Sequence, residues 1–418
     1  MTDEARGRRL ERRGSSVVLP GFQNAHSHAF HRVLRGVGEL ASGDFWSWRR
    51  LMYEVADRLT PESYGELATY VYGEMVLAGY TSVGEFHYLH HQRGGIAYAD
   101  PNEMSWALLE AARAAGIRLS LLDTCYLQAS ASGERLEGVQ LRFSDGGGDE
   151  WSRRVTAAKE SGRFSKKALL GAAIHSVRAV PRRAMESVVA WAAEEDAPLH
   201  VHVSEQPREN AECLDAYQMT PTDLLHQVGA ITRRTTAVHA THLSATDVTR
   251  YGFARASICC CPTTEADLGD GVGPFFDLAE SGAALCIGSD SHAVVDPFLE
   301  ARSLETNQRL VTGRRGVLSC SELAEAAGPA GSRALGWGDE ALSDEVEVRL
   351  DGSPSLAGAE PESDDAVLAR VLYSATPADV ENVTVDGTPV VEHGEHVRLG
   401  PPKAVAERLS RSIAALLR

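Results

Sequence analysis

The first residues whose types and spacing could do chemistry are two histidines one residue apart, His26 and His28. They lie at the end of residues 22–26, a short run that predicts a strand. Alternate residues of a strand point to the same face, so both imidazoles can reach one metal ion. An isolated pair of this kind is weak evidence for a metal site. Its position at the end of a strand is what makes it informative.

A second pair, His200 and His202, lies in the run 198–204 and is followed by Glu205. We expect His202, nearer the carboxyl end of the strand, to be a metal ligand, and His200 to be a hydrogen-bonded histidine of the core. Glu205 comes just after the strand, where a carboxylate can shuttle protons beside a metal site. Taken alone, Glu205 would be read as a surface acid at a helix start.

Two later strands end in residues of the same kinds. The run 235–241 carries His239 and is followed by His242, and their spacing puts them on opposite faces of a strand, so we expect only His239 to point inward. After the run 284–289 comes Asp290. A buried aspartate is rare without a partner. Asp290 could bind a metal ion and also accept a proton from water.

Histidines or acids therefore end four predicted strands in chain order, a placement that core packing rarely produces. Three histidines and one aspartate with an open position for water are typical of a catalytic zinc site. Zinc lowers the pKa of its water to about 7 and so generates hydroxide at neutral pH. The pattern therefore predicts a zinc-dependent hydrolase.

The elements that must position these residues alternate between strands and helices. Helical patterns occupy residues 61–78, with Thr60 as N-cap, and residues 102–115, 182–194 and 221–228. Eight alternating units predict an α/β fold, the (β/α)8 TIM barrel. A doubly wound open sheet is the alternative, but no glycine-rich phosphate loop follows the first strand. The predicted strands are 22–26, 81–86, 117–124, 172–177, 198–204, 235–241, 257–262 and 284–289.

Three regions follow from this pattern. Residues 1–20 are predicted to be the N-terminal segment of an accessory β element, and residues 21–338 the metal-dependent barrel. Residues 339–418 would complete the accessory element, a small β-sandwich that looks short on its N-terminal side, with a hairpin at Asp386-Gly387 and a terminal helix, 402–417. The long insertions 31–58 and 87–100 would lie at the carboxyl face of the barrel, where such loops build lids.

The order HxH, HxxE, His and SDSH resembles the amidohydrolase superfamily over about residues 20–335. Within it, longer strings resemble the formimidoylglutamate deiminases: PGFQNAHSHAFHR, FWSWRRLMY, AGYTSVGEFHYLHH, IHSVRAV, HVHVSEQ, VHATH, CPTTEADLGDG and IGSDSH. The resemblance implies that zinc is bound by His26, His28, His202 and Asp290. It also implies that Glu205 and His239 are catalytic beside Asp290, and that Arg49, Tyr88, His175 and Arg178 bind substrate. The family often has glutamine where this chain has His31, which could add a polar contact.

The resemblance implies hydrolysis of N-formimidoyl-L-glutamate to N-formyl-L-glutamate and ammonia, in histidine degradation. Arginine suits the two carboxylates of this substrate. Binuclear relatives bridge two metals with a modified lysine on strand four, whereas that strand here offers His175 and no lysine, which favours one zinc ion per chain. The alternatives are a related deaminase acting on a ring amine, and a non-catalytic barrel that serves as a scaffold.

Composition narrows the remaining classes. The formal net charge is −17, which argues against nucleic acid as a partner, and no apolar run approaches the roughly 20 residues that span a bilayer. The charged N-terminus is no secretory signal, and seven cysteines without CxxC spacing predict buried, reduced thiols. We therefore expect a cytoplasmic enzyme with a small dicarboxylate substrate. Members of the superfamily are often dimers, which leaves a homodimer open.

Overall fold

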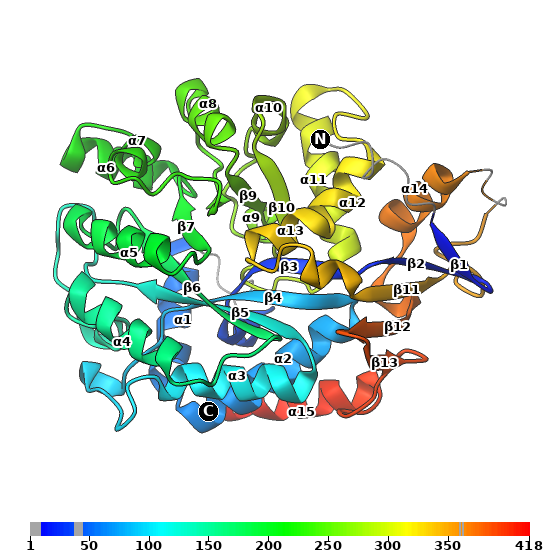
Figure 1. The fold of residues 1–418 in the computed structure, drawn as a ribbon, viewed down its shortest axis with the longest axis horizontal. Helices are drawn as coiled ribbons and strands as arrows, with labels where there is room; N and C mark the ends of the chain where they lie inside the picture. Colours follow the sequence, from blue (N-terminus) through cyan, green and yellow to red (C-terminus); the bar gives the residue numbers. More distant parts are fainter. Residues whose placement is uncertain (1–9, 37–44, 359–360, 362) are drawn as a thin grey trace.

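The core of the molecule is a barrel of eight parallel strands (Figure 1). The computed structural model describes residues 10–36, 45–358, 361 and 363–418. Every predicted barrel strand is present, with ends that differ by a few residues. The strands are β3 (Phe22–Ser27), β4 (Tyr80–His87), β5 (Arg118–Cys125), β6 (Ala168–Ser176), β7 (Leu199–Val203), β8 (Thr235–His239), β9 (Ser257–Cys260) and β10 (Ala284–Ile287).

The barrel is closed by backbone contacts between its first and last strands. The strands neighbour one another in chain order from β3 to β10. Beyond the end of β10, the amide of Asp290 donates to the carbonyl of His26 at 3.0 Å, and the amide of His28 donates to the carbonyl of Asp290 at 3.2 Å. The predicted (β/α)8 barrel is therefore confirmed, and the alternative of an open doubly wound sheet is wrong.

Helices follow the strands and cover the outside of the barrel (Figure 1). Thr60 caps α2 as predicted, because its side chain accepts a hydrogen bond from the amide of Ser63. α3 ends at Gly116, whose φ of 76° is easily adopted only by glycine. The helices are α1 (Phe45–Arg58), α2 (Pro61–Leu77), α3 (Glu103–Ala115), α4 (Gly148–Glu160), α5 (Arg182–Glu194), α6 (Pro207–Tyr217), α7 (Pro221–Gln227), α8 (Ala245–Ala254), α9 (Pro262–Asp267), α10 (Phe275–Ser281), α11 (Pro297–Thr312), α12 (Cys320–Ala327), α13 (Pro329–Ala334), α14 (Asp364–Ser374) and α15 (Pro402–Leu417).

A separate antiparallel sheet forms the accessory element, to the right of the barrel in Figure 1. The N-terminal side contributes two strands, and β2 pairs with β11 along its whole length. Buried Arg118 of β5 donates to both carboxylate oxygens of Asp344 at 2.7 and 2.9 Å, which ties this sheet to the barrel. The predicted hairpin at Asp386-Gly387 joins β12 and β13. The strands are β1 (Glu11–Arg13), β2 (Ser16–Pro20), β11 (Glu345–Arg349), β12 (Val380–Val385), β13 (Thr388–Glu392) and β14 (Glu395–His396).

A buried ion-pair network fixes α4 against β5. The guanidinium of Arg154 donates to both carboxylate oxygens of Asp123 at 2.7 and 2.8 Å, and to both of Asp145 at 2.7 and 2.9 Å. Trp151 also donates to Asp123 at 3.0 Å. Burial alone would raise the pKa of both carboxyls, but the charge of Arg154 holds the pKa of each below its ordinary value.

Two further expectations concern thiols and membranes. All seven cysteines are free thiols, and six of them are buried. In the part of the chain that the structure describes, no helix has the length and apolar composition needed to cross a bilayer. Within the predicted lid 31–58, residues 37–44 lie outside the described residues. Residues 31–34 belong to a short 3-10 helix, Ala29–Leu34, and residues 45–58 form α1.

Candidate active site

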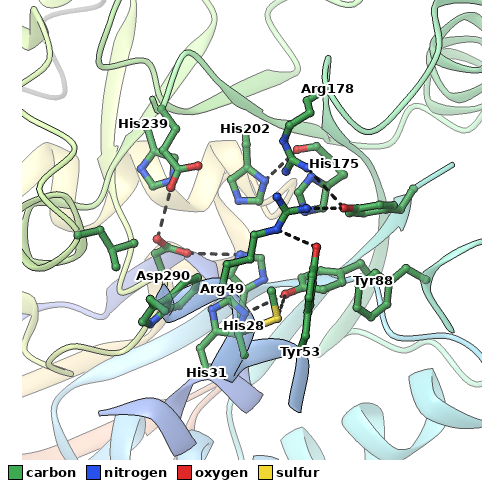
Figure 2. A pocket seen from close by; sticks show the side chains of 16 residues that line it. His28, His31, Arg49, Tyr53, Tyr88, His175, Arg178, His202, His239 and Asp290 are labelled. Carbon is green, nitrogen blue, oxygen red and sulfur yellow. Dashed lines mark hydrogen bonds and ion pairs between the residues drawn. The ribbon is translucent and has the colours of Figure 1, made fainter. Parts of the chain in front are cut away.

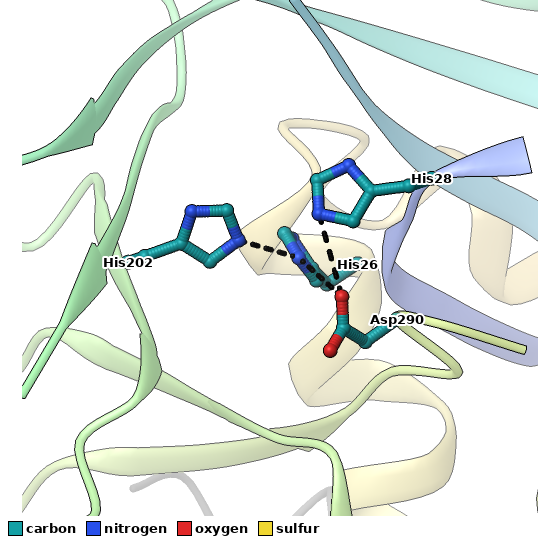
Figure 3. Close-up of side chains that lie close together, drawn as sticks. All are labelled: His26, His28, His202 and Asp290. Atoms are coloured by element: carbon teal, nitrogen blue, oxygen red, sulfur yellow. Dashed lines mark hydrogen bonds and ion pairs between the residues drawn. The ribbon is translucent and has the colours of Figure 1, made fainter. Parts of the chain in front are cut away.

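Four side chains converge where the barrel strands end (Figure 3). His26 is on β3, His28 follows it, His202 is on β7 and Asp290 follows β10. Their ligand atoms all lie within 4.8 Å of one another, and all four residues are buried. We call these four residues the metal cluster.

Hydrogen bonds to the backbone orient two of the imidazoles. Nδ1 of His28 lies 3.0 Å from the carbonyl of Phe86, and Nδ1 of His202 lies 2.9 Å from the carbonyl of His175. Because a carbonyl only accepts, each Nδ1 carries the proton and each Nε2 presents its lone pair to the cluster. Burial lowers the pKa of His26, His28 and His202 well below the ordinary value, so the rings are neutral. Neutral imidazole is the form that binds a metal.

The separations within the metal cluster fit a tetrahedral ion. Nε2 of His26 lies 3.0 Å from Nε2 of His202, and Oδ1 of Asp290 lies 3.3 Å from Nε2 of both His26 and His28. Ligands about 2.1 Å from a tetrahedral zinc ion lie about 3.4 Å apart. The donor set, neutral nitrogens and one carboxylate, suits zinc. The residues present therefore fit the predicted ion.

Beside the metal cluster, His239 lies among carboxylates. Its Nε2 is 3.8 Å from both Oε1 of Glu205 and Oδ2 of Asp290, and its Nδ1 is 3.5 Å from Oε1 of Glu265. Burial would lower the pKa of His239, but these three acids raise it well above its ordinary value. Burial raises the pKa of Glu205. The surroundings therefore favour the protonated form of both His239 and Glu205.

The other end of the site carries two arginines that share one phenol. Arg49, on α1, donates to the hydroxyl of Tyr53 at 2.7 Å and to that of Tyr126 at 3.3 Å. Arg178, after β6, donates to the same Tyr126 hydroxyl at 3.5 Å. Burial would raise the pKa of Tyr126, but the charges of Arg178 and Arg49 lower it to about 8. Arg49 and Arg178 therefore make this end of the site positively charged, although the protein has a net charge of −17.

Three residues of the metal cluster, His28, His202 and Asp290, face the same cavity as the two arginines (Figure 2). Each predicted substrate-binding residue lines it, and so do Glu205 and His239. His31 lies there too, with Nε2 2.8 Å from the hydroxyl of Tyr88. The lining residues are His28, His31, Trp48, Arg49, Met52, Tyr53, Tyr88, Tyr126, Phe143, His175, Arg178, His202, Glu205, His239, Leu268 and Asp290.

Two predicted exclusions also agree with the structure. Nε2 of His200 lies 3.0 Å from the carbonyl of Ala334, so this histidine belongs to the core. His242 does not line the cavity, and its Nε2 lies 2.8 Å from the carbonyl of Asp270. The depth of each histidine along its strand thus separates the residues of the site from the others.

The backbone around the site is strained. Non-glycine residues with positive φ cost of order 1–3 kcal/mol and cluster at functional sites. Here they lie at the end of β8 or just after β7, β8 and β10. Close approach adds a further constraint, because a Cβ on Gly288 would lie 2.9 Å from atoms of Cys259 and His26. The residues with positive φ are Ser204 (52°), His239 (66°), Ala240 (52°), Asp290 (38°) and His292 (60°).

Sequence reasoning missed two residues that shape the site. Glu265 contacts Nδ1 of His239 through its Oε1. The amide of Cys261 donates a hydrogen bond to the same Oε1 at 2.9 Å, which fixes the Glu265 side chain. Its signal was its place in the string CPTTEADLGDG. Tyr126 had only one signal, that it directly follows a barrel strand. Its role as the partner of both arginines appears only in three dimensions.

Comparison with known proteins agrees with this geometry. The sequence profile described as the Amidohydrolase family matches residues 17–341. The chain belongs to the amidohydrolase family. This amidohydrolase is 38% identical to formimidoylglutamate deiminase of Pseudomonas aeruginosa, over 97% of its own chain and 90% of the relative. The family makes it a hydrolase that acts on a carbon–nitrogen bond.

Solved structures resemble the amidohydrolase over almost its whole length. An amidohydrolase from Brucella melitensis is 32% identical, with a TM-score of 0.87, and the match covers 98% of this chain and 96% of the other. An adenosine deaminase from Xanthomonas campestris, solved with bound zinc, is 23% identical with a TM-score of 0.82 over 97% and 87% of the two chains. The second likeness shows the fold alone.

Proposed function

We propose that this amidohydrolase is a zinc-dependent formimidoylglutamate deiminase, which converts N-formimidoyl-L-glutamate and water to N-formyl-L-glutamate and ammonia in histidine degradation. The observation that carries the proposal is the pair Arg49 and Arg178 on the same cavity as the metal cluster. A substrate with two carboxylates and a hydrolysable amidine matches both ends of this cavity. A neutral ring amine has no carboxylates to match the positive charges of Arg49 and Arg178.

The proposed cofactor is one zinc ion at the metal cluster. The neutral histidines, the carboxylate and their separations support it. When bound, zinc supplies a Lewis acid that makes water at the site more acidic. The other steps belong to residues of this chain.

Asp290 and His239 act on the attacking water. In the proposed reaction, Asp290 accepts a proton from the water, whose oxygen forms a bond to the formimidoyl carbon. His239 donates a hydrogen bond to the attacking oxygen. Its Nε2 lies 3.8 Å from Oδ2 of Asp290, so both groups can reach the same water. Glu265 is a positioning residue, because it contacts the opposite ring nitrogen, Nδ1.

Glu205 acts on the departing nitrogen. It lines the cavity beside His239, and we propose that it carries a proton from the attacking oxygen to the terminal amidine nitrogen. The bond between the carbon and that nitrogen then breaks, and ammonia leaves. Asp290 passes its proton to the departing nitrogen as well. Both protons of the water therefore end on ammonia, and the oxygen of the water stays in the formyl group.

The direct test is incubation of the purified protein with N-formimidoyl-L-glutamate. We expect ammonia and N-formyl-L-glutamate in equal amounts, measured by an enzymatic ammonia assay and by mass spectrometry. Free glutamate as the product, or no turnover at all, would contradict the proposal. Adenosine is the comparison substrate, and its faster deamination would favour the ring-amine alternative.

Metal removal should abolish this activity. Dialysis against a chelator is expected to remove about one equivalent of zinc, because one cluster of four ligands holds it. Activity should fall with the metal content, and one equivalent of zinc should restore both, as followed by elemental analysis and the ammonia assay. Full activity in metal-free protein would refute the proposed zinc dependence.

Arg178→Met should weaken recognition of the substrate. A lost hydrogen bond to a charged group costs about 1.5–3 kcal/mol, which corresponds to a decrease in kcat/KM of about 10- to 150-fold. We expect most of this in KM, measured by steady-state kinetics. Arg182→Met, an exposed arginine on α5 that does not line the cavity, is the matched control. Equal effects of both changes would show that Arg178 makes no specific contact.

A further inference from the structure

The thiols of three consecutive cysteines, residues 259–261, have no part in the proposed reaction. The last of them, Cys261, follows β9 and is buried directly beside the site. Its ligand atom, one of His239 and one of Asp290 all lie within 4.8 Å of one another. A thiol, an imidazole and a carboxylate are three ligands that zinc accepts together.

Asp290 can bind a second ion together with His239 and Cys261 while it remains a ligand of the metal cluster. Its Oδ1 is the oxygen that lies 3.3 Å from Nε2 of both His26 and His28. Its Oδ2 points the other way, 3.8 Å from Nε2 of His239 (Figure 2). The two oxygens of one carboxylate are thus divided between two sets of nitrogens. This is the arrangement of a carboxylate that bridges two cations.

The distances need little adjustment. Two ligands of a tetrahedral zinc ion lie about 3.4 Å apart, and the 3.8 Å between His239 and Asp290 differs from this by a few tenths of an ångström. Sγ of Cys261 lies 4.0 Å from the carbonyl of Cys259 and also contacts the thiol of Cys259. Both are weak thiol contacts, so a metal would displace no strong hydrogen bond. His239 and Asp290 also line the cavity, which gives an ion a route to them.

The surrounding charges favour a further cation. Oε1 of Glu205 lies 3.8 Å from His239 Nε2, and Oε1 of Glu265 lies 3.5 Å from its Nδ1. Neither carboxylate is a ligand of the metal cluster. Their negative charges offset part of the cost of placing a second divalent ion close to the first.

We propose that His239, Cys261 and Asp290 form a second, inhibitory site for a thiophilic divalent cation such as Zn²⁺ or Cd²⁺. Binding releases the Nε2 proton of His239 and the thiol proton of Cys261 to solvent. The ion then takes Nε2 of His239, Sγ of Cys261 and Oδ2 of Asp290, so it occupies the two groups that act on the attacking water. Catalysis then stops while the first ion stays in place. The inhibitory half of this inference rests on the proposed function, whereas the binding half does not.

The test uses the protein carrying one equivalent of zinc, titrated with Cd²⁺ in equilibrium dialysis and followed by ultraviolet absorption. Coordination by a thiolate gives a charge-transfer band, which histidine and carboxylate ligands lack. We expect the wild type to take up one equivalent of Cd²⁺ beyond its zinc, with this band, and to lose most of its deiminase activity. Cys261→Ser should keep its zinc and its activity but show neither the band nor the inhibition.

The control is Cys320→Ser, which removes a partly exposed thiol that does not line the cavity and should behave as the wild type. A band that disappears in this variant instead would overturn the inference. So would Cd²⁺ uptake by Cys261→Ser equal to that of the wild type, or uptake by the wild type without loss of activity. If Cys261→Ser does not fold, anomalous diffraction from wild-type crystals soaked in Cd²⁺ decides. A peak between His239, Cys261 and Asp290 supports the site, and its absence refutes it.

Binding of Cd²⁺ can be measured whether or not the protein turns over formimidoylglutamate. If the wild type turned over no formimidoylglutamate at all, the proposed function would fail, while uptake of Cd²⁺ and the thiolate band would still report on the second site. The two proposals can therefore fail separately.

Discussion

Glu205→Gln is expected to lower kcat for formimidoylglutamate by about 10²- to 10⁴-fold, the usual contribution of a positioned acid or base. Glutamine keeps the shape of the side chain but cannot carry a proton. Glu205 is not one of the four residues of the metal cluster, so the zinc content and KM should change little. Steady-state kinetics and elemental analysis of the same preparation measure the three quantities.

The control for this change is Glu160→Gln, which alters an exposed acid at the end of α4 and should leave kcat unchanged. A Glu205→Gln enzyme with full kcat would refute the proton shuttle. A parallel loss of zinc and activity would instead assign Glu205 to holding the metal. The comparison therefore separates proton transfer from metal binding.

Arg154→Met is expected to destabilise the fold by about 3–5 kcal/mol, because breaking a buried ion pair leaves unpaired charge in the interior. Two carboxylates, Asp123 and Asp145, would lose their partner at once. The apparent Tm at a fixed heating rate should fall by several degrees. Arg153→Met is the matched control, since Arg153 makes only an exposed ion pair with Glu150, for which about 0–1 kcal/mol is expected.

The effect of Arg154→Met should depend on pH in one direction. Arg154 holds the pKa of both carboxyls below the value of about 3.9 that aspartate has in an unfolded chain. The stabilisation is therefore fully present above that pH and is lost as the pH falls through the lower, folded values. The difference in Tm between Arg154→Met and the wild type should shrink below about pH 4. A difference that stayed constant down to pH 3 would show that packing, not charge, accounts for it.

The sequence by itself determined the barrel and the place of the metal cluster. Alternating strands and helices allow few arrangements, and parallel strands bring their carboxyl ends to one face. His26, His28, His202 and Asp290 each lie at such an end, so their convergence followed from chain order alone. The depth of His200, one layer below His202, followed from the same periodicity.

The tertiary structure decided the partners of polar side chains. Arg49 of α1 and Arg178, in the loop after β6, both donate hydrogen bonds to the phenol of Tyr126. Nothing in the sequence spacing of these three residues predicts that they meet. Arg154 and its neighbour Arg153 look alike in the sequence, yet one is buried in an ion-pair network and the other is exposed. Backbone periodicity fixes which strand end a residue occupies. Which polar group it meets there depends on side-chain rotamers and on loops from distant parts of the chain, and these are fixed only when the whole barrel is packed.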